Sequence, residues 1–121
     1  MTSPDSTDDR PTGDRPLRWP HYVASYFAGF WAVNVLPHLL HGIDGRPFPT
    51  PFADPPFQGL SSPLVNVLWA LSNVVAVYAL VRAGRVSPRR PMTVALLFAG
   101  FATLAVVMAV VAPSVLPGEG P

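Results

Sequence analysis

Three long runs of uncharged, mostly apolar residues limit what this chain can fold into. They are "HYVASYFAGFWAVNVLPHLLHG" at 21–42, "PLVNVLWALSNVVAVYALV" at 63–81 and "PMTVALLFAGFATLAVVMAVVA" at 91–112. A helix needs about 20 residues to cross the hydrocarbon core of a bilayer. In lipid, a chain segment satisfies its own backbone hydrogen bonds only as a helix. The runs therefore predict an all-α membrane protein with three transmembrane helices, at about 21–41, 63–82 and 90–112.

The alternative is a soluble bundle of three buried helices. Only 12% of the residues are charged, whereas soluble domains have about 25%. None of the three runs has the polar face that a helix on a soluble surface requires. The chain has no cysteine, which excludes disulfides and thiolate metal sites. Its net charge of +1 gives no reason to expect nucleic acid as a partner.

The arginines predict the orientation of the chain in the membrane. Those outside the first connection are Arg10, Arg15, Arg18, Arg82, Arg85, Arg89 and Arg90, and only Arg46 lies in it. Positive residues are enriched on the cytoplasmic side. We therefore expect a multi-pass protein of the cell (plasma) membrane with a cytoplasmic N-terminus and an extracytoplasmic C-terminus. Residues 1–20 are predicted to be a disordered cytoplasmic tail, and 113–121 a short extracytoplasmic tail.

The connection at 43–62 is rich in proline and phenylalanine and is predicted to lie outside the cell. Its prolines exclude a helix or a central strand. Phe48, Phe52 and Phe57 are too apolar for a plain solvated linker. They predict an ordered cap over the helix ends, or a loop that dips into the headgroup region.

Polar residues share one face of the first helix. Asn34, His38 and His41 have the spacing i, i+4, i+7, which places them in a stripe about 60° wide. Asn66 and Asn73 repeat such a spacing in the second helix. Polar groups in lipid turn toward the protein interior and join helices. We therefore predict an interhelical polar cluster of Asn34, His38, His41, Asn66 and Asn73. Pro37 adds a backbone carbonyl without its usual partner.

The two histidines allow a second interpretation. With Asp44, His38 and His41 offer three ligands of the kind that zinc, iron or copper accepts. Gly42 and Gly45 are expected to end the helix nearby. A haem or proton-linked role is a further alternative. In the simplest case the pair only hydrogen-bonds the loop or the carbonyls at the helix end.

Small residues predict where helices approach closely. Ala24, Ala28 and Ala32 repeat every four residues in the first helix, and Ala95, Ala99 and Thr103 do so in the third. Such stripes allow close helix packing in membranes. Three short helices bury little surface, so we expect a homo-oligomer or a larger membrane partner.

The stretch "NVLPHLLHGIDGRPFPTPFADPP" followed by "SSPLVNVLWALSN" resembles small, uncharacterised bacterial three-helix integral membrane proteins without an established activity. The resemblance covers about residues 34–73. It implies that the Pro-His pair, the Thr-Pro-Phe loop and the Asn-x-Leu-Trp stretch form one unit.

These observations favour a small non-enzymatic integral membrane protein with a structural or accessory role. No nucleophile and base share one membrane face, which argues against an enzyme. The first alternative is a membrane protein that binds a metal, haem or small ligand through the face that carries His38 and His41. The second is an oligomeric small transporter, which the lack of an intramembrane Asp or Glu disfavours.

Overall fold

The computed structural model describes residues 15–115, which form three helices and no strand. These are α1 (Trp19–Ile43), α2 (Pro63–Ala83) and α3 (Pro91–Val115). Each is long and apolar enough to cross a membrane. The prediction of an all-helical chain with three such segments is therefore confirmed for this part of the chain. Most of the two predicted tails, at 1–14 and 116–121, lies outside the described residues.

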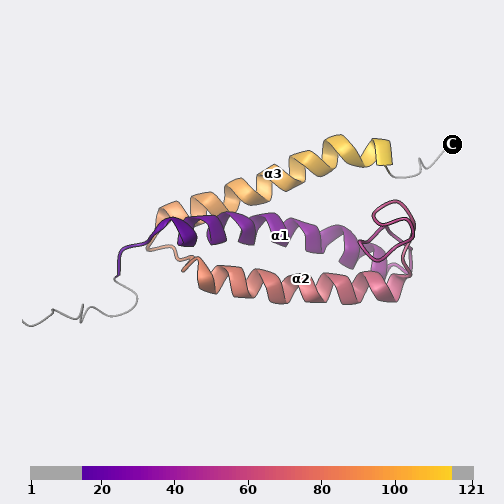
Figure 1. Cartoon of the computed structure of the whole chain (residues 1–121), viewed down its shortest axis with the longest axis horizontal. Helices are drawn as coiled ribbons and strands as arrows, with labels where there is room; N and C mark the ends of the chain where they lie inside the picture. The colour runs from indigo at the N-terminus through magenta and orange to yellow at the C-terminus, as the bar shows by residue number, and fades with distance from the viewer. Residues whose placement is uncertain (1–14, 116–121) are drawn as a thin grey trace, which may run out of the picture.

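The helices form an open layer with α1 in the middle. α1 packs against both α2 and α3, whereas α2 and α3 do not contact each other. Figure 1 shows α3 diverging from α1 toward the end of the molecule that carries the connection between α1 and α2. We call residues 44–62 the cap loop and that end of the molecule the cap end. The opposite end, with the α2–α3 turn at 84–90, is the arginine end.

The observed helix boundaries correct three of the predictions. α1 begins at Trp19 and α3 continues to Val115, so residues assigned to the two tails belong to helices. Gly42 does not end α1, which continues to Ile43. A Cβ atom at Gly42 would lie 2.5 Å from Cγ2 of Val67 and 2.9 Å from the carbonyl oxygen of Pro63. Glycine is required there because α2 approaches closely, and the left-handed turn falls at Gly45 (φ 71°).

The starts of α2 and α3 use side-chain hydroxyls. Ser62 is the N-cap of α2, and its Oγ accepts a hydrogen bond from the Val65 amide at 3.3 Å. Pro63 follows at the first helical position, where its missing N–H costs no hydrogen bond. Before α3, the amide of Ser87 donates to Oγ1 of Thr93 at 3.2 Å. The turn at the arginine end is thereby fastened to the first turn of α3.

Glycines, rather than the predicted alanine stripe, set the contact between α1 and α3. A Cβ atom at Gly29 would lie 1.8 Å from the carbonyl oxygen of Leu97, and one at Gly100 would lie 1.8 Å from that of Tyr26. Ala28 is also fully buried. The stripe predicted on α3 faces outward instead, because the contact with Gly29 turns Gly100 toward α1. The exposed residues of this stripe are Ala95, Ala99 and Thr103.

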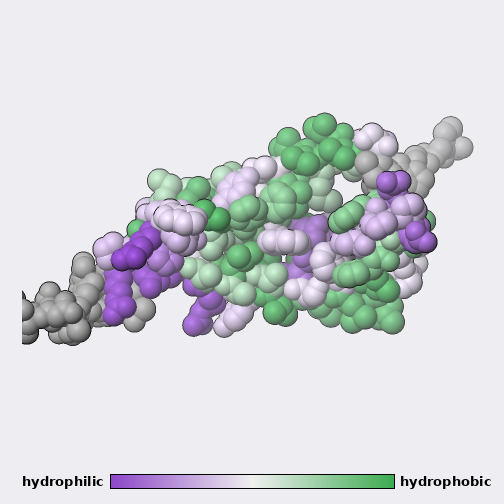
Figure 2. All heavy atoms as spheres, viewed as in Figure 1, coloured by the Kyte–Doolittle hydropathy of each residue, from purple (hydrophilic) through white to green (hydrophobic). Residues whose placement is uncertain are grey.

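Most of the helical surface faces outward. Within the most apolar stretch of each helix, only 28% of α1, 17% of α2 and 6% of α3 is buried inside the protein. Figure 2 shows hydrophobic residues over much of the helical surface, with strongly hydrophilic residues at the arginine end, at the tip of the cap end and in one patch between them. This distribution matches a protein surrounded by hydrocarbon along its middle and by water at its ends.

Candidate functional site

Asn66 joins α2 to α1 and to the cap loop. Its side chain is fully buried, and Nδ2 lies 3.0 Å from the carbonyl oxygen of Phe48 and 3.1 Å from those of Ser61 and Ser62. Its Oδ1 lies 2.8 Å from Nδ1 of His38. Carbonyl oxygens only accept hydrogen bonds, so the amide nitrogen of Asn66 faces them and its oxygen faces the histidine. One buried amide therefore connects three segments.

The cap loop is ordered around a short backbone pairing. The amide of Phe48 donates to the Ser61 carbonyl at 3.2 Å, and the amide of Ser61 donates to the Phe48 carbonyl at 3.0 Å. Thr50 is fully buried; its hydroxyl contacts the Ser61 hydroxyl and accepts from the Phe52 amide at 3.2 Å. These bonds hold the loop over the ends of α1 and α2. Phe48 is buried beneath it, whereas Phe57 remains exposed.

The two predicted histidines lie on α1, and both contact Phe48 of the cap loop. The His38 ring stands edge-on to Phe48, with ring centres 5.3 Å apart, and the His41 ring lies 4.2 Å from it. Nδ1 of His41 lies 2.8 Å from the carbonyl oxygen of Pro37 and donates to it. Each histidine thus has a hydrogen-bonded Nδ1, and its Nε2 has no hydrogen bond within residues 15–115.

The three-ligand metal arrangement is not formed. Asp44 lies beyond the end of α1, where it pairs with Arg46 at 3.0 Å and both side chains are more than half exposed. His38 is instead buried against Asn66. Across residues 15–115, no three His, Cys, Asp or Glu side chains are grouped so that they can hold a metal ion.

The other two predicted members of the polar cluster remain apart from it. Asn73 is buried, but its Nδ2 donates within its own helix to the Trp69 carbonyl at 2.7 Å. The side chain of Asn34 forms no hydrogen bond among the described residues. The structure therefore brings His38 and Asn66 together across two helices, whereas the Asn34 amide, one turn away on α1, has no partner within residues 15–115.

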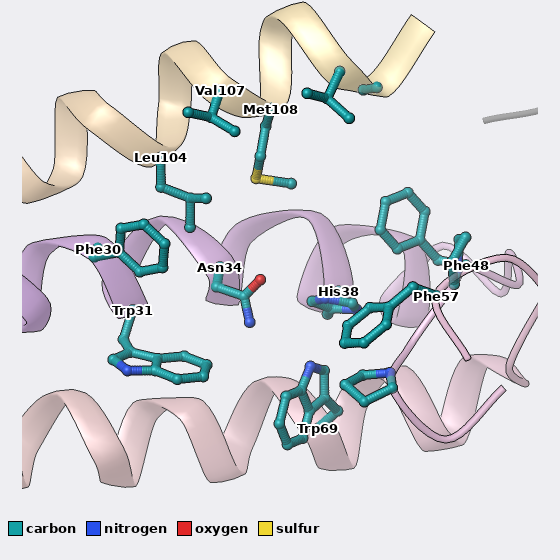
Figure 3. Close-up of a pocket in the computed structure, with 14 residues that line it drawn as sticks. Phe30, Trp31, Asn34, His38, Phe48, Phe57, Trp69, Leu104, Val107 and Met108 are labelled. Carbon is teal, nitrogen blue, oxygen red and sulfur yellow. The ribbon is translucent and has the colours of Figure 1, made fainter. Parts of the chain in front are cut away.

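Asn34 faces a cavity of about 500 Å³ between α1, α3 and the cap loop, as Figure 3 shows. Its residues on α1 are Phe30, Trp31, Asn34 and His38, and those on α3 are Leu104, Val107, Met108, Val111 and Ala112. The cap loop adds Phe48, Pro49, Pro51 and Phe57, and α2 adds only Trp69. The walls are aromatic and aliphatic, and α1 contributes the Asn34 amide and the His38 ring as polar groups beside the indole of Trp31.

Trp69 of α2 links the cavity wall to α1 and to the cap loop. Its ring centre lies 6.5 Å from that of Trp31, 6.4 Å from that of His38 and 5.2 Å from that of Phe52, each at a steep angle. Edge-to-face aromatic contacts of this kind favour one relative orientation of the rings. The wall is therefore held by packing from α1 and the cap loop as well as by the bonds of Asn66.

The contribution of α3 to this site could not be predicted from the sequence. The only polar residue of that helix near Leu104 and Met108 is Thr103, which is exposed, and an apolar run alone does not say which of its residues face a neighbour. The available signal was the polar residue Asn34 inside the first apolar run, which was predicted to pair with the second helix. No family model matches the chain, and neither a curated protein nor a solved structure matches it.

Proposed function

We propose that this protein is a non-enzymatic integral membrane protein that binds a lipophilic small molecule in the cavity between α1, α3 and the cap loop. One observation supports this most strongly: the Asn34 amide has no hydrogen-bond partner among the described residues and faces a largely apolar space of about 500 Å³. Cavities that hold small ligands have volumes of roughly 300–1,000 Å³ and a few placed polar groups. An amide without a partner in hydrocarbon costs free energy, which a bound ligand with its own polar group removes.

The proposed orientation puts this site in the outer half of the membrane. The arginine distribution assigns the arginine end to the cytoplasm, and the cavity lies next to the cap end. α3 diverges from α1 on this side of the molecule (Figure 1). A molecule dissolved in the outer leaflet then enters sideways between the two helices and does not need to cross water.

Two tryptophan substitutions on α3 test the proposal. Val107 lines the cavity, whereas its neighbour Val106 does not line it and is 63% exposed. Val107→Trp places an indole in the cavity, and Val106→Trp adds the same group on the outer face. We expect native mass spectrometry of mildly extracted protein to show a bound lipophilic molecule on the parent and on Val106→Trp, and its loss from Val107→Trp. The same bound mass on all three proteins, or none on any, would refute the proposal.

A structural or accessory role is the second candidate. It is supported by the outward faces of α2 and α3, which have no contact with each other. Phe98 and Val110 of α3 are 70% and 73% exposed. Lipid can cover such faces, so the test is a partner that remains bound after extraction into mild detergent. A homo-oligomer on these faces is tested by the same experiment, and no contact among residues 15–115 favours a transporter over either role.

A further inference from the structure

We propose that the ligand carries an aromatic hydroxyl group, as a phenol or quinol with an apolar chain does. This inference rests on the proposed function and identifies the chemical class that the same cavity selects. It follows from which hydrogen-bonding atoms of α1 remain available and from the shape and chemistry of the walls around them.

The first step is the position of the hydrogen on His38. The nitrogen of the Asn66 amide faces three carbonyl oxygens, so its Oδ1 must accept from His38 Nδ1 at 2.8 Å. A neutral imidazole has one hydrogen. With that hydrogen on Nδ1, the ring offers the lone pair of Nε2, which accepts and does not donate. The buried contact with Asn66 thereby decides what the other side of the ring can bind.

The second step is the pairing of His38 with Asn34. The two residues are four apart on α1, so their Cβ atoms are about 5–6 Å apart on one face. Asn34 has no partner among the described residues and offers both a donor and an acceptor. A hydroxyl has one hydrogen to donate and lone pairs to accept. One hydroxyl therefore satisfies both side chains, by donating to Nε2 of His38 and accepting from Nδ2 of Asn34.

The third step concerns the rest of the ligand. Around the two polar side chains the cavity is lined by Phe30, Trp31, Phe57 and Trp69, as Figure 3 shows. Aromatic side chains hold a flat ring through stacked or edge-to-face contacts. The surface of α3 is aliphatic there and suits an alkyl or isoprenoid chain. The geometry thus combines a hydroxyl, a flat ring and an apolar chain in one molecule, and it ranks a quinol above its quinone, which lacks the hydroxyl hydrogen.

The test compares 4-octylphenol with its methyl ether, 4-octylanisole, which keeps the ring and chain but cannot donate. Binding is measured in nanodiscs from the fluorescence of Trp31 and Trp69, in a Trp19→Phe background that removes the third tryptophan. Asn34→Leu breaks no hydrogen bond of the described residues. His38→Asn keeps an N–H near the position of Nδ1 for Asn66 and removes Nε2. Both variants are checked for helical content and size in solution.

We expect the phenol to bind the parent about five- to tenfold more tightly than either variant, since one hydrogen bond is worth about 1 kcal/mol. The ether cannot donate to His38, but its oxygen can still accept from Asn34. It should therefore bind the parent and His38→Asn within about twofold and lose affinity only in Asn34→Leu. If phenol and ether respond alike to His38→Asn while Val107→Trp prevents their binding, the inference is overturned and the proposed function stands. If 4-octylcyclohexanol binds as tightly as the phenol, the requirement for an aromatic ring is overturned. If no probe binds at the cavity, both proposals fail.

Discussion

Replacing Asn66 with leucine should weaken the connection of α2 to α1 and to the cap loop, without changing the size of the side chain much. The substitution removes the hydrogen bond to His38 and those to the carbonyl oxygens of Phe48, Ser61 and Ser62. The three carbonyls keep a partner: those of Phe48 and Ser61 each accept a backbone amide across their pairing, and that of Ser62 accepts the backbone amide of residue 66. Only Nδ1 of His38 is left without any partner among the described residues.

The expected loss follows from these four bonds. Side-chain hydrogen bonds between helices in membrane proteins average about 0.6 kcal/mol and reach about 1.7 kcal/mol. Because a buried donor is left unpaired as well, we expect Asn66→Leu to lower the free energy of unfolding by about 2–3 kcal/mol. That loss corresponds to roughly a hundredfold change in the folding equilibrium constant.

Asn73→Leu provides the matched control. Asn73 is as buried as Asn66, with 2% and 0% exposed respectively, but its described bond stays within α2, to the carbonyl of Trp69. We expect that substitution to cost below about 1 kcal/mol. Both variants are unfolded reversibly in mixed micelles, with tryptophan fluorescence as the signal, and hydrogen exchange is measured at the amides of Phe48 and Ser61. Equal losses in the two variants, or unchanged exchange at these amides in Asn66→Leu, would refute the assigned role of Asn66.

Two further predictions concern helix packing and orientation. Gly29→Ala puts a methyl group against the Leu97 carbonyl and should lower the free energy of unfolding by about 1–3 kcal/mol in the same assay. A substitution on the outer face, such as Ala99→Val, should change stability little. Equal effects of the two substitutions would contradict the α1–α3 contact. Replacing the arginines of the arginine end by serine and adding three arginines after residue 115 should turn a reporter fused to the C-terminus toward the cytoplasm; an unchanged reporter would contradict the positive-inside argument. The residues replaced are Arg82, Arg85, Arg89 and Arg90.

The helical segments could be predicted because hydrocarbon leaves few choices. An uncharged apolar run of about 20 residues satisfies its backbone in lipid only as a helix. The pairing of His38 with a residue of the next helix could be predicted for a related reason. Consecutive antiparallel helices pack together, and buried polar groups form hydrogen bonds across such contacts. The sequence could not say that Asn66, rather than Asn73, would be the partner. That choice depends on the cap loop, whose carbonyls surround Asn66.

Glycine roles were harder to predict because two different causes produce the same residue. Gly42 was expected to end α1, since glycine is common after a helix. The helix continues through it, and the absence of a Cβ instead lets Val67 and Pro63 approach. Gly29 and Gly100 stand inside apolar runs and fix the α1–α3 contact in the same way. Only the position of the neighbouring helix distinguishes a glycine kept for its backbone angles from one kept for close packing.

Asn34 gives the proposed ligand site a consequence for stability. The side chain has no described hydrogen bond and faces apolar walls from α3, so the folded protein loses hydration of an amide there and gains no bond within residues 15–115. Leucine at this position fills part of the cavity and removes the desolvation cost. Asn34→Leu should therefore raise the free energy of unfolding of the ligand-free protein, by about 0.5–2 kcal/mol.

The same substitution should weaken phenol binding, so stability and binding move in opposite directions. This is the pattern of a residue kept for a ligand at the expense of the fold. The measurement is unfolding in mixed micelles after delipidation, with Leu104→Met as a control that changes the cavity wall without adding or removing a polar group. A loss of stability in Asn34→Leu would show that the amide supports the fold itself, and the observation that carries the proposed function would then have a structural cause.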